Sequence, residues 1–102
     1  MKKMKNFAVV NVVINDAEDA EVVKVVIVSS LEEGKAKVDE MIEEFVAEHG
    51  YEGEELEETV DYYKSDECEY KETDLNNGWQ CSFIDEPSNN PSMVMYRVIE
   101  IG

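Results

Sequence analysis

The sequence is poor in cysteine, histidine and basic residues, and each shortage excludes a class of protein. Two cysteines in 102 residues are fewer than a small disulfide-stapled secreted domain normally carries. The single histidine, His49, would have to serve any Ser-His-Asp or Cys-His catalytic arrangement. Nine Lys and Arg against 25 Asp and Glu leave no basic patch for direct binding to nucleic acid.

Motifs that hold phosphates or metal ions are also missing. The five glycines are scattered and form no phosphate-binding loop. Cys68 and Cys81 lack the Cys-x-x-Cys spacing of redox and zinc motifs, so we predict two buried thiols, with a disulfide across a hairpin as the alternative. The acidic segments 16–21 and 66–69 lack the glycine and glutamate spacing of a calcium loop. We therefore predict no catalytic residues, no cofactor and no bound metal.

The longest apolar runs are too short to cross a membrane. The run at 7–14 has eight residues, whereas a spanning helix needs about 20. The basic start at 1–5 is not followed by the small-residue cleavage pattern of a secretory signal. We expect a cytoplasmic protein with no membrane partner.

The chain does contain enough apolar residues for one folded domain. Its hydrophobic content of 43% is close to that of ordinary globular proteins. A length of 102 residues leaves room for one core, so we predict a single domain over 1–102. Two β-branched runs, 7–14 and 22–28, predict strands joined by the polar segment 15–21. Both runs carry Val or Ile on each face, which favours central strands that are covered on both sides.

After the second strand the apolar period becomes helical. Ser30 and Glu33 are spaced as a capping box, in which each side chain binds the backbone amide of the other residue. Gly34 weakens the first turn by about 1 kcal/mol, and Gly50 suits the left-handed residue that ends a helix. We predict a main helix over 31–49, with His49 at its carboxyl end, where the helix dipole favours a positive imidazole.

The rest of the chain predicts one more helix and three strands. An acidic helix over 54–64 is favoured over a strand that begins near Thr59. Segments 67–73 and 79–84 flank an Asn-Asn-Gly turn and predict a hairpin. A polar loop at 87–91 then leads to a strand over 93–101. The predicted fold class is α+β: a mostly antiparallel sheet of about five strands with one main helix packed on one face.

The acidic charge is concentrated in one stretch. The formal net charge is −16, and residues 48–74 account for −10 of it. Carboxylates four residues apart on a helix lie about 6 Å apart. Those two residues apart on a strand face, such as Glu67 and Glu69, lie about 6.7 Å apart. Successive phosphates of a nucleic-acid strand have a comparable spacing.

We therefore predict a small non-enzymatic module that presents carboxylates to a basic protein. An inhibitor that mimics nucleic acid would be one module of this kind. In composition the chain is similar to small acidic inhibitors made by phages and mobile elements. The alternative is an accessory or assembly domain that self-associates or docks through a strand edge, with an acidic face that only keeps the protein hydrated. The predicted partner-binding residues are Glu52, Glu54, Glu55, Glu57, Glu58, Asp61, Tyr62, Asp66, Glu67 and Glu69.

Overall fold

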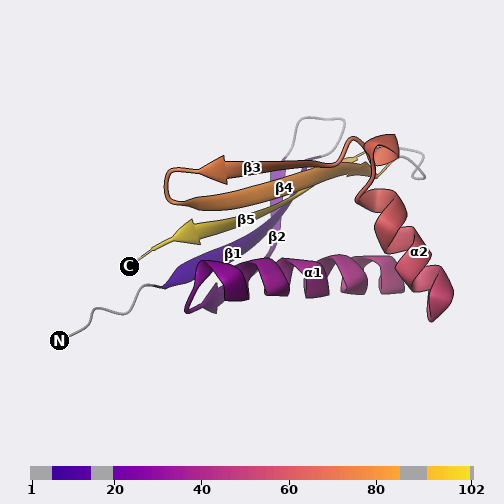
Figure 1. The fold of residues 1–102 in the computed structure, drawn as a ribbon, viewed down its shortest axis with the longest axis horizontal. Helices are drawn as coiled ribbons and strands as arrows, with labels where there is room; N and C mark the ends of the chain where they lie inside the picture. Colours follow the sequence, from indigo (N-terminus) through magenta and orange to yellow (C-terminus); the bar gives the residue numbers. More distant parts are fainter. Residues whose placement is uncertain (1–5, 15–19, 86–91, 102) are drawn as a thin grey trace.

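The computed structural model describes residues 6–14, 20–85 and 92–101, and it confirms the predicted α+β class (Figure 1). The described elements are β1 Phe7–Ile14, β2 Ala20–Val28, α1 Leu31–Glu48, α2 Glu54–Tyr63, a 3-10 helix Asp66–Cys68, β3 Lys71–Leu75, β4 Gly78–Asp85 and β5 Ser92–Glu100. The basic start at 1–5, the loop at 87–91 and most of the connection at 15–21 lie outside the described residues. None of the described helices is long and apolar enough to cross a membrane.

One five-stranded sheet organises the molecule, with its strands in the order β2-β1-β5-β4-β3. Every neighbouring pair of strands is antiparallel. The central position predicted for both N-terminal strands is confirmed for β1 and wrong for β2, which is an edge strand whose Val25 and Ile27 are more than half exposed. The predicted cover on both faces is wrong for both strands, because the two helices lie on one side of the sheet (Figure 1). The error arises because β-branched residues favour a strand on either face, whether or not another layer covers that face.

The main helix begins and ends almost where its sequence signals predict. Ser30 Oγ accepts from the Glu33 amide at 3.1 Å, as a capping box requires. The reciprocal bond differs from the prediction, because the Glu33 carboxylate accepts from the amide and hydroxyl of Ser29, at 3.2 and 2.6 Å, instead of from the Ser30 amide. These bonds lower the pKa of Glu33. At the other end α1 stops at Glu48, and Gly50 has the expected left-handed φ of 93°.

The hydrophobic core lies between α1 and one side of the sheet. Val38, Ile42 and Val46 of the helix are at most 1% exposed, and they belong to one cluster with buried residues of β1, β4 and β5. Gly34 has a packing role that its helix propensity hides. A Cβ at Gly34 would lie 2.4 Å from Val98 Cγ1, so glycine permits the close approach of α1 to β5.

The segment after α2 departs from the prediction. Residues 67–73 were expected to form one strand, but Asp66–Cys68 is a 3-10 helix, Glu69 is left-handed with a φ of 53°, and β3 begins at Lys71. The alternation of acidic and apolar residues is typical of a strand. In the structure a turn directs the Cys68 side chain into the core, at 0% exposure, and leaves the neighbouring acidic residues outside. The predicted strand-face spacing of Glu67 and Glu69 is therefore wrong.

Candidate functional site

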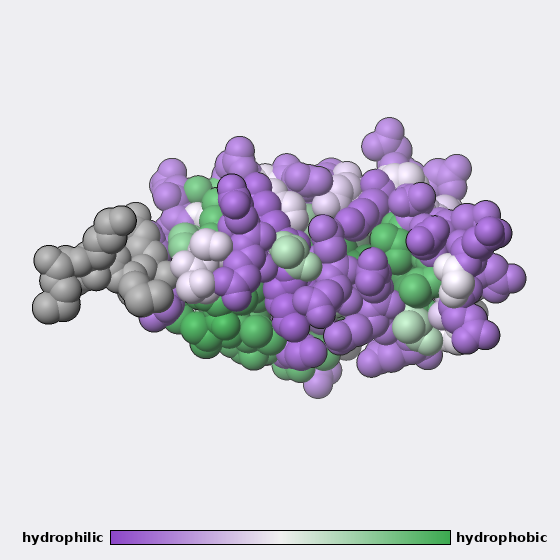
Figure 2. Space-filling view, turned by 60° about the horizontal axis from the view of Figure 1, so that its bottom comes forward, coloured by the Kyte–Doolittle hydropathy of each residue, from purple (hydrophilic) through white to green (hydrophobic). Residues whose placement is uncertain are grey.

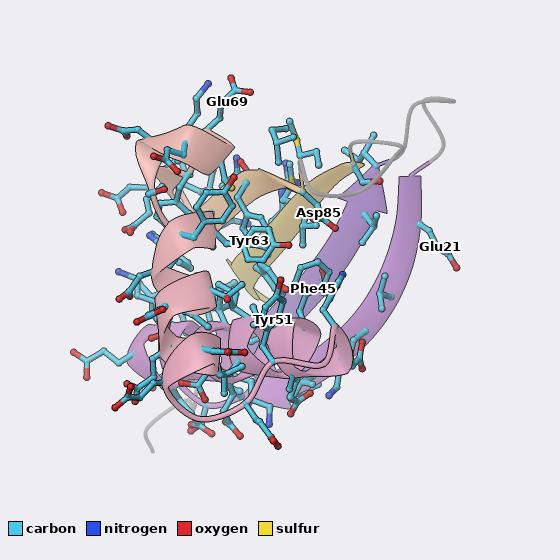
Figure 3. The ribbon with its side chains drawn as sticks, turned by 90° about the vertical axis from the view of Figure 1, so that its right-hand side faces the viewer. Glu21, Phe45, Tyr51, Tyr63, Glu69 and Asp85 are labelled. Carbon is cyan, nitrogen blue, oxygen red and sulfur yellow. The ribbon has the colours of Figure 1, made fainter. Side chains whose placement is uncertain are left out.

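The second helix is confirmed, and its apolar face fixes how its carboxylates are presented. Gly50 and Gly53, both with positive φ, reverse the chain between α1 and α2. Tyr63 is then 2% exposed, and Leu56 and Val60 pack partly buried against the core. With this face turned inward, the glutamates of α2 are all exposed. Figure 3 shows side-chain oxygens along the outer edge of α2, far from Glu21 on β2.

A groove of about 260 Å³ lies where α2 meets α1, lined by Leu56, Val60, Glu43, Glu57 and Asp61. The three carboxylate residues are exposed, whereas Leu56 and Val60 are partly buried. Carboxylates beside aliphatic side chains suit a lysine or arginine, whose stem is apolar and whose head is charged. The sequence analysis did not predict Glu43 as a site residue. The helical period places it on the solvated face of α1, and nothing in the sequence indicates that α2 packs beside it.

The ten predicted partner-binding residues lie along α2 and the segments that flank it. Glu52 precedes the helix, five carboxylates are on it, and the other three follow in the 3-10 helix and at Glu69. All nine carboxylate residues are exposed, while Tyr62 is half-buried with its ring 5.8 Å from that of Tyr63. Within the described residues, no ion pair joins any of the nine to a cation.

Two lysines of the helical side are engaged by carboxylates outside the predicted acidic stretch. Lys64 Nζ lies 2.6 Å from Asp39 Oδ1, and Lys24 Nζ lies 3.5 Å from Glu44 Oε2. Arg97 donates to the Gln80 side chain. The charge of the predicted acidic stretch is therefore left largely uncompensated.

A cavity of about 410 Å³ lies on the helical side, between α1 and the β3-β4 hairpin. Its lining includes Lys35 and Lys64, but both cations are already occupied. Lys64 pairs with Asp39, and Lys35 Nζ lies 5.2 Å from the centre of the Trp79 ring. This cavity has lining residues of both charges, whereas every charged residue that lines the groove beside α2 is acidic.

A polar cluster, buried at Tyr63 and Asp85 and exposed at His49, joins the ends of three elements. Tyr63 OH donates to Asp85 Oδ1 at 2.9 Å, and His49 Nε2 lies 4.0 Å from Asp85 Oδ2. His49 caps α1 as predicted, with Nδ1 2.8 Å from the Phe45 carbonyl oxygen. Burial and the bond to Asp85 raise the pKa of Tyr63, so its hydroxyl remains a donor. The cluster ties α1 and α2 to the end of β4, and sequence spacing gave no sign of it.

The two cysteines are buried thiols and not a disulfide, as the sequence favoured. Burial raises the pKa of Cys81 to about 12. Since the thiolate is the reactive form of cysteine, Cys81 is a poor nucleophile at neutral pH.

No protein-family model, curated protein or solved structure matches the chain. The function must therefore be inferred from the geometry of the site.

Proposed function

We propose that the chain is a non-enzymatic binding module that docks a basic surface of another protein on its acidic side. The acidic side is defined here as α2, its flanking carboxylates from Glu52 to Glu69, and Glu43 of α1. The observation that carries the proposal is the groove beside α2, where three exposed carboxylates meet two aliphatic side chains. The groove is the anchor point for a lysine or arginine of the partner.

The surrounding charge supplies attraction over a longer range. The net charge of −16 steers cationic surfaces toward the molecule and repels nucleic acid and anionic lipid. The carboxylates of the acidic side that have no cationic partner within the described residues are open to a partner's lysines and arginines.

The chemistry favours a partner that normally binds nucleic acid. On α2, Glu54 and Glu58, and likewise Glu57 and Asp61, are four residues apart, which places their carboxylates about 6 Å apart. This spacing suits a nucleic-acid-binding cleft of the partner, in which Lys and Arg side chains contact successive phosphates. If α2 occupied that cleft, it would inhibit the partner by competing with nucleic acid.

The test is an affinity capture from host extract on the immobilised chain, washed at graded salt, followed by a binding titration with each recovered protein. We expect basic proteins whose affinity falls steeply as salt rises, because the attraction is between exposed charges. A recovered complex with salt-independent affinity would contradict the proposal.

A matched pair of triple variants locates the contact. Glu43→Gln with Glu57→Gln and Asp61→Asn removes the charge of the groove, and we expect at least about tenfold weaker binding. Glu21→Gln with Glu32→Gln and Asp74→Asn changes the net charge equally at exposed positions elsewhere, and we expect a much smaller effect. Equal losses in the two variants would show that total charge acts without this site.

A further inference from the structure

The side of the sheet that faces away from the helices, called here the open face, carries apolar side chains on β2, on β1 and on β5 except at Arg97. Cross-strand partners share a face, and the register aligns Val10 with Val25, Ala8 with Ile27 and Ile99, and Val12 with Met95. Both helices lie on the opposite side of the sheet (Figure 1). Three strands, β2, β1 and β5, therefore present an uncovered apolar surface.

The open face has no carboxylate among the described strand residues. The strands contain five acidic residues, and each pairs across the sheet with a residue on the side that faces the helices. Their cross-strand partners there are Val13 for Glu21, Cys81 for Glu72, Trp79 for Asp74, Ser92 for Asp85 and Phe7 for Glu100. The charged residues on the open-face rows are Lys71 and Arg97, which are partnered in register with Ser82 and Gln80.

Exposure is greatest at the β2 side of this surface. Val22, Val25 and Ile27 are between 54 and 58% exposed. Viewed from the helical side, the molecule is mostly hydrophilic, and hydrophobic atoms gather at the lower left margin and in a second group on the right (Figure 2). Large apolar side chains exposed side by side are typical of an interaction surface.

We propose that the open face of a second copy of the chain covers this surface, giving a two-fold dimer with both acidic sides outermost. The proposal goes beyond the binding of a basic partner, because it concerns the other side of the sheet. Packed sheets stack face to face at about 10 Å with interdigitated side chains. The apolar part of the open face can pack on the same part of a second copy in this arrangement.

The area of the open face is sufficient for such a dimer. Five strands about 4.8 Å apart, with about 3.3 Å per residue, project roughly 600 Å² from each copy. The two copies then bury about 1,200 Å², which is within the range of specific protein interfaces. Pairing through the β2 edge alone would leave Val12, Met95 and Ile99 uncovered, and for that reason we assign the face and not the edge.

The charge distribution favours a second copy in this orientation. Two molecules of net charge −16 repel each other when their acidic sides approach. Stacking of the open faces keeps the two acidic sides apart by two helix layers and the sheet interface, roughly 30 Å. That distance exceeds several Debye lengths of about 8 Å at physiological salt.

The test is sedimentation equilibrium of the full chain from low to high micromolar concentration. We expect a monomer–dimer equilibrium that strengthens as salt rises, because salt screens the repulsion between two acidic molecules. A monomer throughout this range would overturn the proposal. The proposed binding of a basic partner has the opposite salt dependence, so the two proposals can fail independently.

Three variants with the same charge change locate the interface. Val25→Glu lies on β2, and Ile84→Glu lies on β4 away from the β2 edge. Both introduce a carboxylate into the open face and should weaken the dimer at least about tenfold. Ala36→Glu, at an exposed position on α1, should leave the dimer intact. Circular dichroism checks that each variant folds. A dimer that is lost with Val25→Glu but kept with Ile84→Glu would indicate edge pairing and overturn the stacked arrangement.

Discussion

The two sides of the sheet differ in what they expose, although they alternate along the same strands. On β4 the odd-numbered residues such as Phe83 are buried under the helices, while Ile84 and Ser82 of the open face are partly exposed. The helical layer displays the carboxylates, and the open face has none among the described strand residues. This segregation of charge is the observation on which the two proposed binding roles rest.

The largest expected difference between the two sides is in packing. Phe83→Ala removes a ring that is 1% exposed and should lower the free energy of unfolding by about 3–5 kcal/mol. Ile84→Ala, one residue along, should cost about 1 kcal/mol or less in dilute protein. Urea unfolding measures both free energies. Similar losses in dilute solution would mean that the open face is covered within one chain. A cost for Ile84→Ala that grows with protein concentration would support the dimer.

A smaller difference is expected between two buried tyrosines of the helical side. Tyr63→Phe deletes the bond to Asp85 and leaves a largely buried carboxylate without its donor, so stability should fall by about 1–3 kcal/mol. Tyr96 is 0% exposed, and its hydroxyl has no partner among the described residues. Tyr96→Phe should therefore leave thermal stability unchanged or raised. A large loss at Tyr96 would reveal a hydrogen bond that the described residues do not include.

The elements of the fold could be predicted from local signals. The period of the apolar residues, the Ser30 cap and Gly50 place α1 to within one residue, and β-branched runs place β1, β2 and β5. The pattern failed at Cys68, because alternation of period two describes a strand and a turn with one inward residue equally well. It also failed for β2, since sequence shows which residues favour a strand but not which layers are available to cover it.

The candidate site was only partly accessible to the same reasoning. Charge counting located the acidic stretch, and the helical period turned the glutamates of α2 outward. Glu43 of the groove and Asp85 of the polar cluster come from other segments of the chain, so contact with α2 depends on tertiary packing. The absence of carboxylates from the open face likewise depends on strand register, which the strand predictions alone do not fix.

The smallest expected effect concerns the stability cost of the acidic side. Asp61 lies in the last turn of α2, which has no basic residue, and it follows Glu57 and Glu58 at helical spacing. Asp61→Asn removes repulsion between like charges and an unfavourable interaction with the helix dipole, so the free energy of unfolding should rise by about 0.5 kcal/mol. Glu54→Gln, in the first turn, removes a favourable dipole interaction and should give no gain. Urea unfolding at low salt compares them. A gain in the free energy of unfolding for Asp61→Asn, combined with weaker partner binding, would show that this carboxylate is retained for binding at the expense of stability. A loss of stability in the same variant would show that Asp61 supports the fold.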